Sequence, residues 1–328
     1  MGQTRSGLML SDKTLRLVPD ERRASARFLA LVLSSSHVRS QVDSLLSGST
    51  GQGNISQESV EELRIPDIPV VDQRSLVEVL DELAEAESAL EASIAKLRTV
   101  RSSVVASVIP RGHELGMLAE STGCATSVRW VPVNEVGSVR MGKQLSPGSR
   151  ASSEQYPYLR VANVLEERID YSGVKTMAFS DGERLAYRLE PGDILLNEGQ
   201  SLELVGRSAI YERGPGEFYF QNTLVRFRAG DGMLSRYAQA VFNCWLNAGV
   251  FVQIAKKTTS IAHLGAERFG SLLFPLVPLA EQRRIVDLVD AWDTRIRSSE
   301  DELSKLRGLK RGVMDDLLSG RVRVGSAE

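Results

Sequence analysis

The chain has 328 residues, enough for about two globular domains that each bury a core. Its 40 basic and 42 acidic residues leave a net charge of −2, so a nucleic-acid-binding surface would have to concentrate positive charge locally. The two cysteines and three histidines lack zinc-site spacing, so the sequence predicts no metal and no cofactor. The longest nearly apolar run, 272–280, is too short to cross a bilayer, and the first residues lack a signal peptide's apolar segment. We expect a cytoplasmic protein with no membrane partner.

Two segments of the chain repeat each other at an offset of 209 residues. A common offset over nearly a hundred residues indicates duplication of one large unit rather than a short solenoid repeat. The matching pairs include Arg27 with Arg236, Pro69 with Pro278, Gln73 with Gln282, Asp81 with Asp290, and Lys96-Leu97-Arg98 with Lys305-Leu306-Arg307.

The first copy of the repeat is shorter than the second. Before its long helix the first copy keeps only 14–56, with one helix-like stretch at 22–46. The second copy has about a hundred further residues, 113–217, that precede the position equivalent to Met9 of the first copy. We therefore expect the chain to start within a repeat, with a first domain that cannot close a core alone.

Each copy ends in a long helix with a heptad pattern of apolar residues, 72–108 and 281–318. Sustained three-four spacing is typical of a coiled coil, and at 1.5 Å per residue the first helix would be about 55 Å long. The seam residues, which we also expect to serve partner docking, are Leu76, Leu80, Leu83, Leu90, Ile94 and Leu97 in the first helix and Ile285, Val289, Trp292, Ile296, Leu303 and Leu306 in the second.

Charge along the two helices predicts how they pair. The first carries seven acids in 72–91 and four bases with no acid in 96–111. The second has the same polarity, with seven acids in 281–302 and six bases in 303–324. Antiparallel packing brings each acidic half to a basic half, whereas parallel packing would oppose like charges. We expect an intramolecular antiparallel coiled coil; two independent solvated helices are the alternative.

Between the helices lies a region with strand-like runs at 128–133, 158–164, 193–196, 206–211 and 223–227, separated by turn residues. A helix-like stretch follows at 235–254. The pattern predicts a mixed α+β globular domain.

Motifs for catalysis are incomplete. Residues 137–143 match the first seven positions of a phosphate-binding loop, but Gln144 cannot supply the hydroxyl that ligates magnesium, and Pro147 follows where a helix should begin. An exposed lysine on a turn, or a phosphate-contacting turn, are the alternatives for Lys143. We found no methyltransferase tetrapeptide, nucleophile elbow or nuclease-like group of acids, so the sequence predicts a non-catalytic protein.

Local charge favours DNA recognition. Residues 201–275 hold eight bases against five acids, and polar side chains able to contact base edges stand at predicted strand ends or turns. The candidate DNA-contacting residues are Lys143, Gln144, Arg160, Asn163, Asn197, Gln200, Arg207, Gln221, Asn222, Lys256, Lys257, Thr258 and Thr259.

The doubled order of motifs resembles the specificity subunit of type I restriction–modification systems. The motifs are 278–285 (PLAEQRRI), 305–307 (KLR), 317–322 (LLSGRV), and in the first copy 48–51 (GSTG) and 54–56 (NIS), followed by Pro69 and Gln73. The resemblance implies two target-recognition domains, each reading one half of a split DNA site, separated by two helices that form an antiparallel coiled coil. It also implies adenine methyltransferase subunits docked on that coiled coil, and an ATP-dependent restriction and translocation subunit as a further partner.

This interpretation divides the chain into a partial first target-recognition domain (1–66), a first coiled-coil helix (67–112), a complete second target-recognition domain (113–275) and a second coiled-coil helix with a tail (276–328). The expected function is recognition of a bipartite DNA site by a specificity subunit. A coiled-coil scaffold that binds only protein is the alternative, and strong salt dependence of duplex binding would separate the two.

Overall fold

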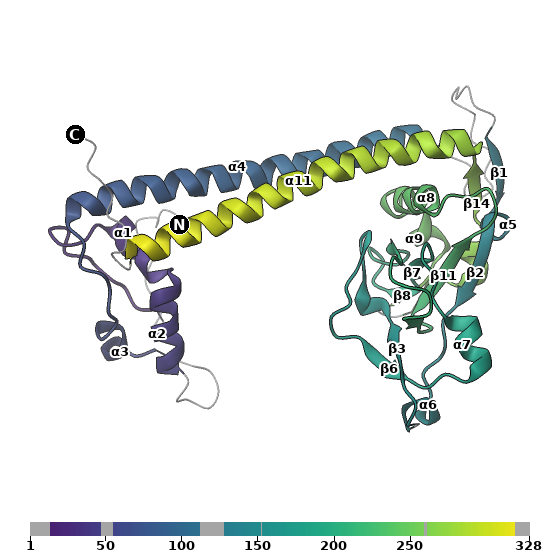
Figure 1. Ribbon diagram of the computed structural model, residues 1–328, viewed down its shortest axis with the longest axis horizontal. Coiled ribbons are helices and arrows are strands. Elements are labelled where there is room, and N and C mark those ends of the chain that lie inside the picture. The colour runs from purple at the N-terminus through teal and green to yellow at the C-terminus, as the bar shows by residue number, and fades with distance from the viewer. Residues whose placement is uncertain (1–13, 47–54, 112–127, 152, 259–260, 319–328) are drawn as a thin grey trace. The chain divides into compact units, whose positions relative to one another are not determined.

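The computed structural model describes residues 14–46, 55–111, 128–151, 153–258 and 261–318 and divides the chain into two compact units (Figure 1). Unit 1 comprises 1–96 and 296–328, and unit 2 comprises 97–295. Two long helices, α4 (Val70–Val108) and α11 (Leu279–Leu318), each contribute a segment to both units. None of the described helices has the length and apolar character that a membrane crossing requires.

Unit 1 packs α1 (Ala26–Leu33), α2 (Ser36–Leu46) and α3 (Gln57–Glu61) with its segments of the long helices. Phe28 and Val32 of α1 are buried with Leu76 and Leu80 of α4. The expectation of one helix over 22–46 is wrong, because the chain breaks between α1 and α2. There the buried Ser35 hydroxyl donates to the Val32 carbonyl at 2.6 Å and accepts the Val38 N–H, which ends one helix and caps the next.

The long helices form the predicted antiparallel coiled coil. None of the twelve predicted seam residues is exposed; seven are buried and the other five are half-buried. The buried seven are Leu76, Leu80, Ile94, Ile285, Val289, Ile296 and Leu303, and the half-buried five are Leu83, Leu90, Leu97, Trp292 and Leu306.

Ion pairs follow the predicted charge gradients within each unit. In unit 1, Glu87 from the acidic part of α4 accepts from Arg307 at 2.7 Å and from Lys310 at 2.9 Å, both in the basic part of α11. In unit 2, Arg101 from the basic part of α4 donates to Asp293 of α11 at 2.6 Å. Opposite charges therefore meet on the flanks of the seam, as antiparallel pairing requires.

Unit 2 is built on a four-stranded antiparallel sheet of order β2-β11-β7-β9, with a three-stranded sheet β10-β3-β6 beside it. Two smaller sheets, β12-β13-β8 and β1-β14, and the pair β4-β5 complete the strands. The strands are β1 (Arg129–Pro132), β2 (Gly137–Met141), β3 (Tyr156–Leu159), β4 (Val164–Leu165), β5 (Arg168–Ile169), β6 (Lys175–Met177), β7 (Ile194–Asn197), β8 (Gly199–Gln200), β9 (Ser208–Ile210), β10 (Tyr219–Phe220), β11 (Leu224–Ala229), β12 (Lys256–Lys257), β13 (Ala262–His263) and β14 (Leu273–Leu276). The helices are α5 (Val133–Val136), α6 (Pro147–Ala151), the 3-10 helix η1 (Val161–Asn163), α7 (Asp181–Tyr187), α8 (Ser235–Asn247), α9 (Val250–Ile254) and α10 (Ala266–Gly270).

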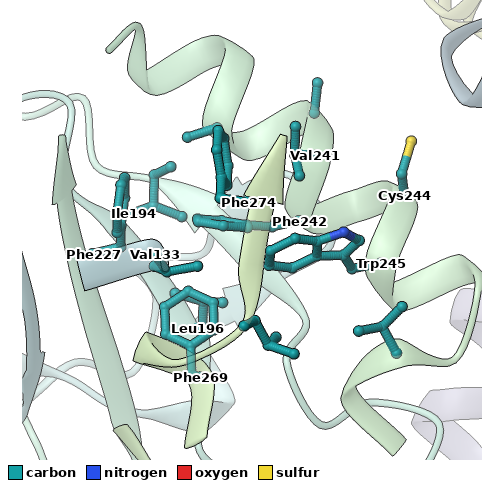
Figure 2. Close-up of a cluster of buried hydrophobic side chains, with 14 of the residues drawn as sticks. Val133, Ile194, Leu196, Phe227, Val241, Phe242, Cys244, Trp245, Phe269 and Phe274 are labelled. Carbon is teal, nitrogen blue, oxygen red and sulfur yellow. The ribbon is translucent and has the colours of Figure 1, made fainter. Parts of the chain in front are cut away.

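Both faces of the four-stranded sheet are covered, so alternate residues of a strand enter different cores. On one face Ile194, Leu196 and Phe227 pack with Phe242 and Trp245 of α8 (Figure 2). The same core includes Val105 of α4 and Ile285 of α11, so within unit 2 the helix pair packs onto the globular part. On the other face Leu195 and Leu224 pack with Leu159 and Phe220 of the neighbouring sheet.

The predicted helix over 235–254 is also interrupted. It ends at Asn247 and resumes as α9 at Val250, because Gly249 adopts a φ of 73°, in the left-handed region that ends α-helices.

A buried glutamine repeats in both units with the same hydrogen bonds. The Gln73 carboxamide accepts the Ser25 N–H at 3.1 Å and donates to the carbonyls of Arg23 at 2.7 Å and Ile68 at 2.8 Å. Gln282 accepts the Leu234 N–H at 2.9 Å and donates to the carbonyls of Gly232 and Val277, both at 3.0 Å. Each partner in unit 2 lies 209 residues after its counterpart in unit 1.

An ion pair repeats at the same offset. Arg27 of α1 pairs with Asp81 of α4, and Arg236 of α8 pairs with Asp290 of α11 at 2.9 Å. The duplication predicted from the sequence is therefore also a duplication of structure. In each copy a short helix packs against the first turns of a long helix, and the buried glutamine and one Arg–Asp ion pair hold the two helices together.

We expect Gln282→Ala to lower the free energy of unfolding by about 3 kcal/mol, because three backbone groups lose a buried partner. Urea unfolding followed by tryptophan fluorescence measures this, since all three tryptophans lie in unit 2. Gln253→Ala, at an exposed position of α9, is the matched control and should change stability little. Equal effects of the two variants would contradict the assignment.

The ion pairs of Glu87 predict an acid-sensitive coiled coil. Hydrogen bonds from Lys310 and Arg307 hold the pKa of Glu87 below its ordinary value of 4.5. A lowered folded-state pKa stabilises the protein above the unfolded value, and this contribution is lost as pH falls below about 4.5. The stability difference between the wild type and Glu87→Gln should therefore shrink from pH 6 to about pH 3.

Circular dichroism during thermal unfolding at each pH measures this difference. Glu85→Gln, at an exposed position of the same helix, serves as the control and should leave a small difference at every pH. A pH-independent difference for Glu87→Gln would contradict the prediction.

Candidate nucleic-acid interface

Polar residues from four strands meet at one end of the β2-β11-β7-β9 sheet. Because neighbouring strands are antiparallel, the end of β7 at Asn197 lies beside the start of β11 and the start of β9. Backbone hydrogen bonds hold these ends together: the Asn197 N–H donates to the Arg207 carbonyl, and the Glu198 N–H to the Thr223 carbonyl, both at 2.9 Å. Most of the predicted DNA-contacting residues lie at or next to this sheet end.

Lys143, Gln221 and Asn222 are immediate neighbours there. Lys143 pairs with Gln221 in a parallel bridge, and the Asn222 N–H donates to the Lys143 carbonyl at 3.0 Å. Gly142 permits this approach, because a Cβ at that position would lie 2.2 Å from the Gln221 carbonyl oxygen. Arg160 follows β3, whose Leu159 carbonyl accepts the Gln221 N–H at 3.0 Å.

The Lys143 ammonium is engaged within the fold. It donates to Glu183 at 2.5 Å and to the Ala178 carbonyl at 2.9 Å, and lies 5.0 Å from the Phe179 ring centroid. Its side chain is only 12% exposed, so the alternative of an exposed lysine on a turn is wrong. Hydrogen bonds from Lys143 and from the Ser180 N–H lower the pKa of Glu183. Gln144, the next residue, is exposed.

Two of the predicted asparagines are buried. The Asn163 carboxamide accepts the Arg160 N–H at 3.2 Å and donates to the carbonyls of Asp170 and Ser172 at 2.9 and 3.2 Å, so it closes the turn around η1. The Asn197 side chain is fully buried, donates to the Val164 carbonyl at 3.4 Å, and has an oxygen with no partner among the described residues. Both residues shape the sheet end from inside.

The small sheet β12-β13-β8 carries the second group of predicted residues. Lys256 and Lys257 form β12 and are both exposed, and β13 joins them to β8, where Gln200 is half-buried. Thr258 begins the connecting turn, in which its N–H and hydroxyl both donate to the Ile261 carbonyl at 2.8 and 2.9 Å. Thr259 lies outside the described residues.

A histidine that the sequence analysis passed over lies on this small sheet. The His263 Nδ1 is 3.1 Å from a carboxylate oxygen of Glu198, and the ring is 41% exposed. The Glu198 N–H bonds to Thr223, so this contact connects the small sheet to the end of the large one.

Two arginines at the sheet end each have a buried donor atom without a hydrogen-bonding partner among the described residues. The Nε atoms of Arg160 and Arg207 are buried and have no partner among the described residues. Burial lowers the pKa of Arg207, and Glu166 opposes that change.

The sheet end and the small sheet beside it carry basic and amide side chains. Within the described ranges no group of three or more His, Cys, Asp or Glu side chains could hold a metal ion. What it offers is exposed ammonium groups beside amide side chains, which bind phosphates and base edges respectively.

We expect Asn163→Asp to destabilise unit 2 by about 2 kcal/mol at neutral pH, because two donated hydrogen bonds are replaced by a carboxylate facing two carbonyls. Urea unfolding measures the loss, with Asn247→Asp at an exposed position as control. Unchanged stability together with altered DNA preference would assign Asn163 to base contact instead.

Comparison with known proteins places this geometry in a family. Residues 128–307, more than half of the chain, match the family described as "Type I restriction modification DNA specificity domain". The MjaX type I restriction enzyme specificity subunit of Methanocaldococcus jannaschii is 26% identical over 166 residues, covering 50% of this chain and 39% of that protein. The EcoKI specificity subunit of Escherichia coli K12 is 22% identical over 319 residues, covering 92% and 67%.

A solved structure agrees at the level of fold. It comes from work on the "structural basis underlying complex assembly and conformational transition of the type I R-M system", has a TM-score of 0.64 and 17% identity, and matches over 92% of this chain and 73% of that one. The chain thus spans about two fifths of the MjaX protein and about two thirds of the EcoKI subunit. The family match, the repeated helix pair and the sheet end together establish that this chain belongs to the type I restriction–modification DNA specificity family, whose specificity subunits are non-catalytic.

Proposed function

We propose that this chain is the DNA target-recognition subunit of a type I restriction–modification complex. The observation that carries the proposal is the convergence of basic and amide side chains at one sheet end, inside the region that matches the family. In this role the chain performs no chemistry. It binds a DNA sequence and brings catalytic subunits to it.

Recognition divides between two kinds of contact. Gln200, Gln221 and Asn222 carry amides, which can pair with base edges in the major groove. Lys256 and Lys257 are exposed on a short strand beside them and would contact phosphates, which fix register without reading sequence. Gln144 and Thr258, both exposed, extend the same surface.

The site is bipartite in this proposal. The chain carries two copies of one structural unit, each with a buried glutamine and an ion pair at the start of a long helix. Two copies of one unit are suited to two separated parts of a DNA site. In this proposal residues 113–275 form one complete target-recognition domain, which reads one of the two parts.

Partner subunits follow from the same proposal. DNA adenine methyltransferase subunits dock on the coiled coil, and an ATP-dependent restriction and translocation subunit completes the complex. Co-expression of the chain with a candidate methyltransferase and co-purification test this directly. Glu85 is exposed on α4 outside the seam, so its charge reversal tests docking on the coiled coil without disturbing helix pairing.

We expect Lys256→Ala with Lys257→Ala to weaken binding to all DNA duplexes by a similar factor, because phosphate contacts carry no sequence information. The slope of log binding constant against log salt should fall in magnitude by about 1 to 2. Fluorescence anisotropy with duplexes of different sequence, at several salt concentrations, gives both quantities.

The control removes the same charge elsewhere. Lys96 and Lys305 are exposed on the coiled coil, and their double alanine variant should leave the salt slope unchanged. Equal slopes for both double variants and the wild type would remove 256–257 from the interface. Duplex binding without salt dependence would contradict the proposed function.

A further inference from the structure

We infer that Arg140 and Arg226 form a phosphate-binding pair that holds the DNA backbone beside the proposed recognition surface. This inference rests on the proposed function and deepens it by naming a phosphodiester site that the comparisons do not assign. Arg140 is the exposed member and Arg226 the buried one.

The two arginines lie directly opposite each other on neighbouring strands. Arg140 of β2 and Arg226 of β11 are partners in the antiparallel register, and opposed residues project from the same face of a sheet. Like charges directly opposite each other destabilise a sheet unless something compensates them. The pairing therefore carries an electrostatic cost that a bound anion would remove.

Arg226 is buried without a carboxylate partner. The residue is 5% exposed, and its Nε has no hydrogen-bonding partner among the described residues. Within the described part of the chain its guanidinium makes a long 3.4 Å hydrogen bond to the Arg188 carbonyl and lies over the Phe220 ring, 5.5 Å from the centroid. Burial lowers the pKa of Arg226 to about 10. Asp193 and Glu190 oppose this change, Arg228 and Arg140 add to it, and the guanidinium is still charged at neutral pH.

Neighbouring carboxylates are already engaged by other arginines. Asp193, whose side chain is fully buried, accepts from Arg228 at 2.6 and 2.7 Å. Glu190 accepts from Arg188 at 2.7 Å. Four arginines therefore share two carboxylates here, and neither carboxylate forms an ion pair with Arg226 or Arg140 among the described residues.

The geometry favours a phosphodiester of DNA as the occupant. The backbone of Arg140 pairs with Arg226 in the sheet, but its side chain makes no hydrogen bond or ion pair within the described part of the chain, so its guanidinium is available at the surface. It lies three residues before Lys143, on the strand whose continuation pairs with Gln221 at the sheet end. A backbone phosphate held there would lie beside bases read by the amides of that sheet end, and guanidinium groups bind phosphate oxygens in bidentate fashion.

The main test measures the salt dependence of duplex binding by Arg140→Gln. Because Arg140 has a free, exposed side chain, the variant should fold normally, which tryptophan fluorescence checks. We expect its affinity for mixed-sequence duplex to fall about fivefold and its salt slope to fall in magnitude by about 1 between about 50 and 200 mM NaCl. Arg129→Gln, at an exposed position on β1, loses the same charge and should retain the wild-type slope.

The buried member is tested by a double-variant cycle with Arg226→Lys, which keeps a positive charge. If both side chains bind one phosphate, the loss in the double variant should be clearly smaller than the product of the single losses. If the Arg226→Lys variant does not fold, the salt slope of the Arg140→Gln variant alone decides whether the inference stands. An Arg140→Gln slope equal to that of Arg129→Gln overturns the inference, as does multiplicative behaviour in the cycle.

Inorganic phosphate distinguishes a DNA phosphate from a free anion. We expect about 10 mM phosphate, at matched ionic strength, to leave the thermal midpoint of the wild type unchanged, because one phosphodiester contact is weak without the rest of the duplex. Stabilisation by phosphate that Arg140→Gln abolishes, with duplex binding intact, would make this a small-anion site and overturn the inference. Absence of any duplex binding by the wild type would instead overturn the proposed function.

Discussion

One buried amide in each copy of the repeated unit fixes the start of a long helix against a short one. Gln73 and Gln282 are 1% and 0% exposed, and each satisfies one N–H and two carbonyls. For Gln282 the accepted N–H belongs to Leu234, the N-cap residue of α8, so the amide pairs a backbone group at the start of this helix.

Packing in unit 2 builds outward from the contacts of Gln282. α8 is held at its start by Gln282, and its apolar face covers the large sheet through Phe242 and Trp245. Arg101 of α4 bonds to Asp293 at 2.6 Å and to Glu167 at 2.7 Å, and Asn243 of α8 donates to the same Glu167 carboxylate at 2.5 Å. A continuous set of hydrogen bonds thus connects the helix pair, α8 and the turn between β4 and β5. The sheet end is held on a rigid support, as a binding surface requires.

Sequence reasoning succeeded where a signal was repeated many times. Six apolar seam positions in each helix and matched charge gradients predicted the coiled coil. A constant offset of 209 residues predicted the duplication, which the structure shows in the matching hydrogen bonds of Gln73 and Gln282. It failed at single residues whose role depends on distant partners. Nothing local separates Asn163, which closes a turn, from Asn222 at the strand end. The helix α7, which brings Glu183 to Lys143, begins with a capping box of Ser180 and Glu183, a local signal that was overlooked. The serine break in 22–46 was missed because serine is neutral at most helical positions.

Arg226 and Arg228 illustrate the same limit inside one strand. They are two residues apart and share a face, yet one donates twice to a fully buried carboxylate and the other has none. The difference arises from the loop before β7, which delivers Asp193 to only one of them.

The repeated glutamine has a consequence for how the two copies can diverge. Its amide must donate at one end and accept at the other, so glutamate loses the donors and leucine loses both functions. No other side chain of similar size serves all three backbone groups. Substitution at this position in either copy therefore costs buried hydrogen bonds, so the contact between the short and the long helix keeps the same geometry even where the two copies differ in sequence around it.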